Sequence, residues 1–147
     1  MSGPPPPPPF GYPAPLPSEP TTQQRLLLVV AHLGGLIMSF GSVGVLGFAI
    51  PLGVYLVWRD SDTFVAANAR QALNFQLTIL TLATVAVLLS VPAVIIGVLT
   101  FGVGIVVLLA LAATVVVLWI LLPLIAVAHG LKGRVYRYPF TLRYLKG

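Results

Sequence analysis

The chain has 147 residues, of which 58% are hydrophobic and only 7% charged, and its formal net charge is +5. A soluble domain carries about 25% charged residues, so these few charges cannot cover a water-facing surface, and the composition predicts one membrane domain. The chain contains no cysteine, which excludes disulfides and thiolate metal sites. Basic chains often bind nucleic acid, but these charges lie at the ends of apolar segments, and we expect no nucleic-acid partner.

Residues 1–22 are expected to form a disordered, Pro-rich cytoplasmic tail. Ten of the fourteen prolines fall within residues 1–20, and six of them form the run Pro4–Pro9. Such a run cannot form a helix and favours polyproline II conformation. The tail could be a ligand for a proline-recognising partner, but we favour a plain spacer.

The apolar residues that follow predict four helices. Read as one helix, residues 26–58 would be about 50 Å long, which exceeds a hydrocarbon core of about 30 Å, so Gly41 and Ser42 are expected to divide two helices. No charged residue occurs between Arg70 and Lys132, so that stretch must cross the membrane and return, with Pro92 and the glycines of 97–104 marking the turn. We therefore predict an all-α integral membrane protein, a four-transmembrane-helix bundle in residues 23–130 with helices at about 24–40, 43–58, 64–91 and 102–129.

The basic residues predict the orientation of this bundle. Arg25 precedes the first helix, Arg59 and Arg70 flank the second and third, and the other five lysines and arginines follow the fourth. All of them fall on one side, and the positive-inside tendency makes that side cytoplasmic. We expect a multi-pass protein of the bacterial cell (inner) membrane, with its N- and C-termini in the cytoplasm.

The C-terminal segment, residues 131–147, interleaves aromatic and basic side chains. Aromatic rings with polar tips favour the headgroup layer, and arginines favour anionic phosphates. We expect a strip that lies on the cytoplasmic surface and contacts the anionic headgroups of the bilayer through Arg134, Tyr136, Arg137, Tyr138, Arg143 and Tyr144.

Polar side chains concentrate on one face of the third predicted helix. At 100° per residue, most of them fall within about 80° of one another, with one asparagine at the edge of the stripe. A polar side chain inside a membrane helix is a functional candidate. Together with a histidine of the first helix, they form a candidate polar groove of Asn68, Gln71, Asn74, Phe75, Thr78 and His32.

Two interpretations of this groove are open. The amides can bond neighbouring helices, which we favour, or they can line a groove open to the cytoplasm for a substrate, a peptide segment or a lipid headgroup. His32 could be a proton relay or a ligand, but a bond to a neighbouring carbonyl or amide is the favoured interpretation.

Evidence for catalysis is weak. Asp60-Ser61-Asp62 has the acid-x-acid form used by metal-dependent transferases, but helix capping and pairing with Arg59 explain it better. Two histidines and three acids are too few to predict a metal site. We expect no catalytic residue, no metal and no cofactor, and the protein is not predicted to be an enzyme.

Several short motifs, taken in order, suggest a family. They are Ala31-His32-Leu33-Gly34-Gly35-Leu36, Trp58-Arg59-Asp60, Gln71-Ala72-Leu73-Asn74-Phe75-Gln76 and Tyr136-Arg137-Tyr138-Pro139-Phe140-Thr141. Over residues 24–146 the chain resembles a prokaryotic family of small multipass membrane proteins of unknown function, which looks distantly related to the twenty-kilodalton Tic subunit of the chloroplast inner-envelope protein-import machinery. The chain departs from that family between Phe64 and Gln71, where it lacks the histidine and acids that members often carry.

The resemblance implies a four-helix bundle and leaves the function open, because a fold does not carry function by itself. We expect a non-enzymatic component that binds a membrane-protein partner or forms a homo-oligomer, as an assembly factor of the Tic type would. The alternative is a small-solute or ion transporter or channel that acts as an oligomer. A lipid-active enzyme that uses Asp60 and Asp62 is the remaining hypothesis.

Overall fold

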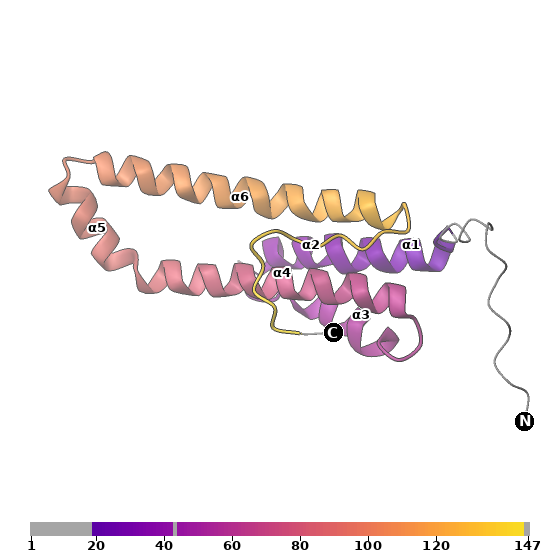
Figure 1. Cartoon of the computed structure of the whole chain (residues 1–147). Helices are drawn as coiled ribbons and strands as arrows, with labels where there is room; N and C mark the ends of the chain where they lie inside the picture. The colour runs from indigo at the N-terminus through magenta and orange to yellow at the C-terminus, as the bar shows by residue number, and fades with distance from the viewer. Residues whose placement is uncertain (1–18, 43, 146–147) are drawn as a thin grey trace, which may run out of the picture.

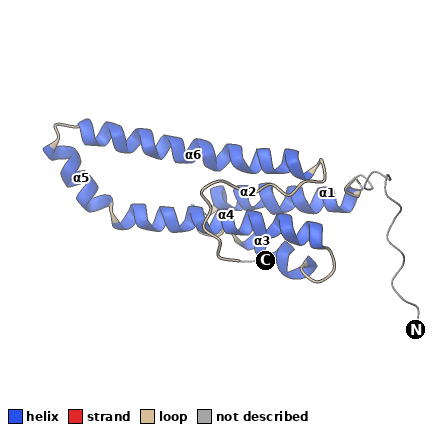
Figure 2. Cartoon of the chain, in the orientation of Figure 1, coloured by secondary structure: helices blue, strands red, loops and turns tan. Residues whose placement is uncertain are grey.

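The computed structural model describes residues 19–42 and 44–145, and this part of the chain consists of helices joined by turns, without a strand (Figure 2). The prediction of an all-α protein is thus confirmed for the described residues. The Pro-rich run expected to form a tail lies outside them. In chain order the elements are α1 (Thr22–Val29), a π-helical turn η1 (Val30–Gly34), α2 (Gly35–Gly41), α3 (Ala49–Trp58), α4 (Thr63–Leu88), α5 (Ser90–Leu99) and α6 (Val103–Gly130).

Three stretches of helix are long and apolar enough to cross a membrane. The first joins α1, η1 and α2 without a break over Thr22–Gly41, and the others are α4 and α6. α3 and α5 have 10 residues each, and at 1.5 Å per residue they are only about 15 Å long. Length and composition thus support three of the four predicted crossings, and the crossing expected at 43–58 stays a prediction.

Two helix boundaries near prolines differ from those expected. Pro51 and Pro92 each lie in the first turn of a short helix, α3 and α5, where a missing N–H costs nothing. α3 begins at Ala49 and not near residue 43, after a turn in which Gly44 has a φ of 87°. Pro92 lies at the start of α5 and not at the turn of the hairpin. The chain reverses further along, where Phe101 and Gly102 have positive φ angles of 51° and 86°.

The helices form two hairpins. The shorter one joins α1–α2 to α3, and the longer one joins α4 through α5 to α6. Figure 1 shows α1–α2, α3, α4 and α6 side by side, while α5 and the adjoining ends of α4 and α6 extend beyond α2. At the other end, Gln24 Nε2 donates to Asp62 Oδ2 at 2.8 Å, and Gly130 lies against Leu28. The start of α1, the α3–α4 loop and the end of α6 therefore come together, and the basic residues that flank them gather at this end.

Small residues allow α1–α2 and α3 to pack closely against each other and against α4. One buried cluster consists of Ala31, Val54, Val65, Ala69 and Ala72. Gly47 faces α2 so closely that a Cβ atom there would lie 1.7 Å from Ser39 Oγ. Ser39 Oγ in turn donates to Gln76 Oε1 at 3.2 Å, which ties α2 to α4 in the buried interior.

Candidate functional site

The segment after α6 folds back along α4 instead of leaving the bundle. Figure 1 shows its yellow trace crossing over α2 and α4. Gly133 (φ 73°) and Phe140 (φ 58°) adopt the left-handed conformation, and these two positions reverse or redirect the chain. We call residues 134–145 the docked segment.

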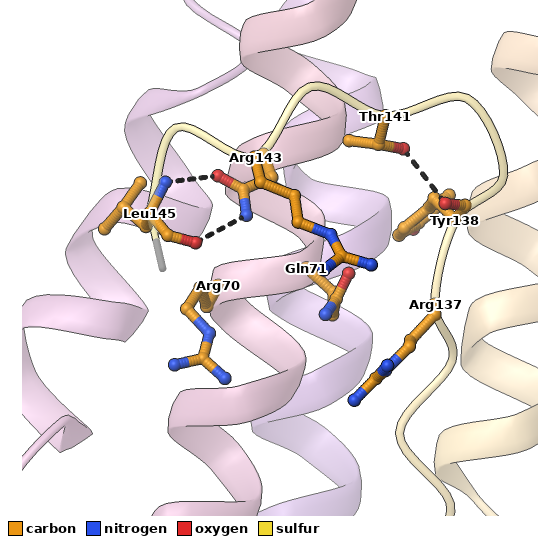
Figure 3. Close-up of a pocket in the computed structure, with 8 residues that line it drawn as sticks. Arg70, Gln71, Arg137, Tyr138, Thr141, Arg143 and Leu145 are labelled. Atoms are coloured by element: carbon orange, nitrogen blue, oxygen red, sulfur yellow. Dashed lines mark hydrogen bonds between the residues drawn. The ribbon is translucent and has the colours of Figure 1, made fainter. Parts of the chain in front are cut away.

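Asn74 holds the end of the docked segment with both atoms of its amide. Its Nδ2 donates to the Leu145 carbonyl at 3.1 Å, and its Oδ1 accepts from the Leu145 N–H at 2.9 Å; Figure 3 shows both as dashed lines at Leu145. One turn along α4, Thr78 Oγ1 accepts from the Leu142 N–H at 3.0 Å. The amide stripe thus bonds backbone groups of the chain's own C-terminal segment.

Tyr138 anchors the middle of the docked segment inside the bundle. Its hydroxyl lies 2.7 Å from His32 Nδ1, and its ring stacks on Phe75 with the centroids 4.4 Å apart. Tyr138 is only 7% exposed and His32 only 1%. The sequence predicts Tyr138 in a surface strip, whereas the structure buries its side chain in the interior beside His32.

The other members of the predicted groove differ in their surroundings. Asn68 is fully buried, and its Nδ2 donates to the Phe64 carbonyl one turn back in the same helix at 3.0 Å. Its Oδ1 and the Nε2 of His32 are buried atoms with no hydrogen-bond partner in the described part of the chain. Gln71 lines a cavity between α4 and the docked segment.

The remaining residues of the predicted surface strip are accessible. Arg134, Arg137 and Arg143 are exposed, Tyr136 is half-buried, and Tyr144 is 48% exposed while its hydroxyl bonds Thr81 Oγ1. Their contact with lipid headgroups stays a prediction.

The cavity beside Gln71 has a volume of about 300 Å³. Figure 3 shows side chains of α4 on one wall and side chains of the docked segment on the other. Sequence reasoning missed Arg70, because it points away from the amide stripe, and the arginines of the docked segment were assigned to the lipid surface. The signal available was that Arg70 has no acidic residue within four positions on its helix. The lining residues are Arg70, Gln71, Asn74, Arg137, Tyr138, Thr141, Arg143 and Leu145.

The acidic loop before α4 caps that helix, as predicted. Asp62 Oδ1 accepts from the N–H groups of Phe64 and Val65, each at 3.0 Å. Partial burial alone would raise the pKa of Asp62, but the bonds from Val65, Gln24 and Phe64 together hold it below its usual value. Asp60 pairs with Arg59 at 3.1 Å, so both carboxylates of the acid-x-acid motif have structural partners.

The described residues form an all-helical protein of the membrane type, with three helices that are long and apolar enough to cross a membrane. Residues 23–145 match the magnetosome magnetite crystal formation protein family, and the chain belongs to that family. The expected kinship with the Tic subunit is wrong, because the family that matches almost the whole helical region is this one and no relationship to Tic is found. No curated protein and no solved structure is detectably similar to the chain.

Proposed function

We propose that the protein is a non-enzymatic assembly component of the membrane in which magnetite forms, and that it works with further copies of itself or with a partner membrane protein. The family match over residues 23–145 is the observation that carries this proposal. The helices supply the second support, because their outward faces suit lipid and other membrane helices better than water.

The apolar surface is concentrated on α6 and on the far ends of the longer hairpin. The most apolar window of α6 has a mean hydropathy of 3.1, and only 6% of it is buried within the chain. A groove of about 740 Å³ lies between α2, α4 and α6 and is lined mainly by apolar side chains such as Leu82, Leu111 and Trp119. In this proposal the side chains of a neighbouring helix fill the groove.

The acidic residues support a non-enzymatic role. The chain has only three acids, and Glu19 pairs with Arg25, Asp60 pairs with Arg59, and Asp62 caps α4. Within the described ranges, no three His, Cys, Asp or Glu side chains come together as a metal site would require. We therefore place the contribution to magnetite formation in membrane organisation and in binding other proteins.

Photocrosslinking tests the assembly role in membranes of a host that forms magnetite. A benzophenone side chain at Leu111 would enter the groove, and one at Leu109 serves as the matched control because it is exposed on α6 but does not line the groove. We expect a recurring protein adduct, to a second copy or to one partner, that is stronger at Leu111. Lipid adducts alone at both positions would refute the assembly role.

We further propose four crossings, with α3 and the turn before it as a short return and both termini in the cytoplasm. The position of Arg25, Arg59, Lys132 and Arg134 at one end of the bundle supports this orientation. The chain has no cysteine, so single cysteines can be labelled without background. An impermeant maleimide outside spheroplasts should modify Val45→Cys and Phe101→Cys but not Ser61→Cys; modification of Ser61→Cys from outside would refute the crossing by α3.

A further inference from the structure

The cavity between α4 and the docked segment concentrates positive charge. Arg70 comes from α4, and Arg137 and Arg143 come from the docked segment. Figure 3 shows the three guanidinium groups around one space, with the side chain of Gln71 between them. Asn74 and Thr141 add neutral polar groups to the lining, which contains no carboxylate.

The acids of the chain do not neutralise this charge. The whole sequence has three acidic side chains. Glu19 and Asp60 form ion pairs with Arg25 and Arg59, and Asp62 accepts bonds from the start of α4 and from Gln24. A counter-charge for the three cavity arginines must therefore come from outside these side chains.

We propose that the cavity binds a terminal phosphate group, carried either by a lipid headgroup or by inorganic phosphate. Guanidinium groups match phosphate oxygens with paired N–H donors, and three of them favour a dianion over the single charge of a phosphodiester. A volume of about 300 Å³ lies at the lower end of small-ligand sites, which suits a headgroup-sized ligand.

The two walls of the cavity couple phosphate binding to the docking of the C-terminal segment. One wall belongs to α4, and the other exists only while Tyr138, Thr141 and Arg143 lie against it. A ligand that needs both walls stabilises the docked state by its binding free energy. Phosphate binding should therefore slow the opening of the segment.

Titration of the full chain in neutral detergent micelles tests the proposal. The probes are dioctanoyl phosphatidic acid, which ends in a terminal phosphate, dioctanoyl phosphatidylglycerol, which has only a phosphodiester, and sodium phosphate. We expect phosphatidic acid to bind at least about tenfold more tightly than phosphatidylglycerol. Competition by sodium phosphate would identify a site open to the soluble anion, and binding of phosphatidic acid without such competition would identify a lipid site. Equal affinity for the two lipids, or no binding of phosphatidic acid and phosphate, would overturn the proposal.

Matched arginine substitutions separate the cavity from general surface charge. Arg143→Gln and Arg70→Gln should each weaken phosphatidic acid binding about tenfold or more, because a charge-assisted bond is lost. Arg143→Lys should bind with intermediate affinity, since an ammonium group lacks the paired donors. Arg134→Gln is the control, because Arg134 is exposed on the same segment but does not line the cavity. An equal loss in Arg134→Gln and Arg143→Gln would overturn the proposal.

Hydrogen exchange supplies a readout that does not depend on the affinity measurement. The N–H groups of Leu142 and Leu145 bond α4 side chains, so their exchange reports whether the segment is docked. Phosphatidic acid or phosphate should slow both amides in the parent chain and in Arg134→Gln, but not in Arg70→Gln. Unchanged exchange in the saturated parent chain would contradict binding between the two walls.

Discussion

Replacement of Asn74 by alanine should release the end of the docked segment. The Asn74 amide makes two hydrogen bonds with the backbone of Leu145, at 3.1 and 2.9 Å. Each contributes about 0.5–1.5 kcal/mol net, so the variant should lose about 1–3 kcal/mol of docking free energy. Leu145 is half-buried, so water can reach its freed N–H and carbonyl groups, which places the expected loss in the lower half of that range.

This loss of about 1–2 kcal/mol corresponds to an increase of roughly five- to 25-fold in the open population, because about 1.4 kcal/mol is a factor of ten. Hydrogen exchange of the Leu145 amide in detergent or nanodiscs measures that population directly. Gln71→Ala is the matched control, because Gln71 lies less than one turn away and lines the same cavity. If the Leu145 amide exchanged equally fast in Asn74→Ala and in Gln71→Ala, the two Asn74 bonds would play no part in docking.

Three further substitutions test other parts of the structure. Tyr138→Phe keeps the ring but removes the buried bond to His32, and it should lower the free energy of unfolding by about 1–3 kcal/mol, measured by denaturant titration; an unchanged midpoint would contradict that bond. Asp62→Ala should cost about 1 kcal/mol at neutral pH. The pKa of Asp62 is lower in the folded state, so the ionised cap stabilises the fold fully above the unfolded pKa and less as pH falls through the folded pKa. The free energies of unfolding of the parent and of Asp62→Ala should therefore converge in acid. A difference between them that does not change with pH would contradict this. Gly97→Val should open the α5–α6 hairpin, since even a Cβ there would lie 2.6 Å from Ile105 Cγ1, and disulfide trapping of paired cysteines across the hairpin should become slower than in the parent.

The helical content could be predicted because few alternatives exist for such a composition. From Gln76 to Ala128 the chain has no charged residue, and a long apolar stretch satisfies its backbone in lipid only by forming helices. The start of α3 could not be predicted equally well. Residues 43–48 are as apolar as the helix that follows, and what ends the helical conformation there is local geometry, with Gly44 at a φ of 87°.

The docked position of residues 134–145 could not be predicted, because their sequence suits two environments. Alternating aromatic and basic residues favour a lipid interface, and the same tyrosines can equally stack and bond inside a bundle. What decides is a long-range match between Tyr138 and His32, 106 residues apart. A hint was present in His32 and Asn74, since buried polar groups need partners and the other helices offer few.

The docked segment also limits which surface a partner can use. It occupies the polar groove for which a peptide was one of the open alternatives, and it is held there by five hydrogen bonds, from the two Asn74 contacts, Thr78, Thr81 and His32. At about 0.5–1.5 kcal/mol each, an outside peptide would first have to overcome about 2.5–7.5 kcal/mol, which reduces its apparent affinity by more than tenfold. A partner should therefore bind the apolar faces of α4 and α6, and the cavity beside the segment is left for a ligand small enough to enter without displacing it.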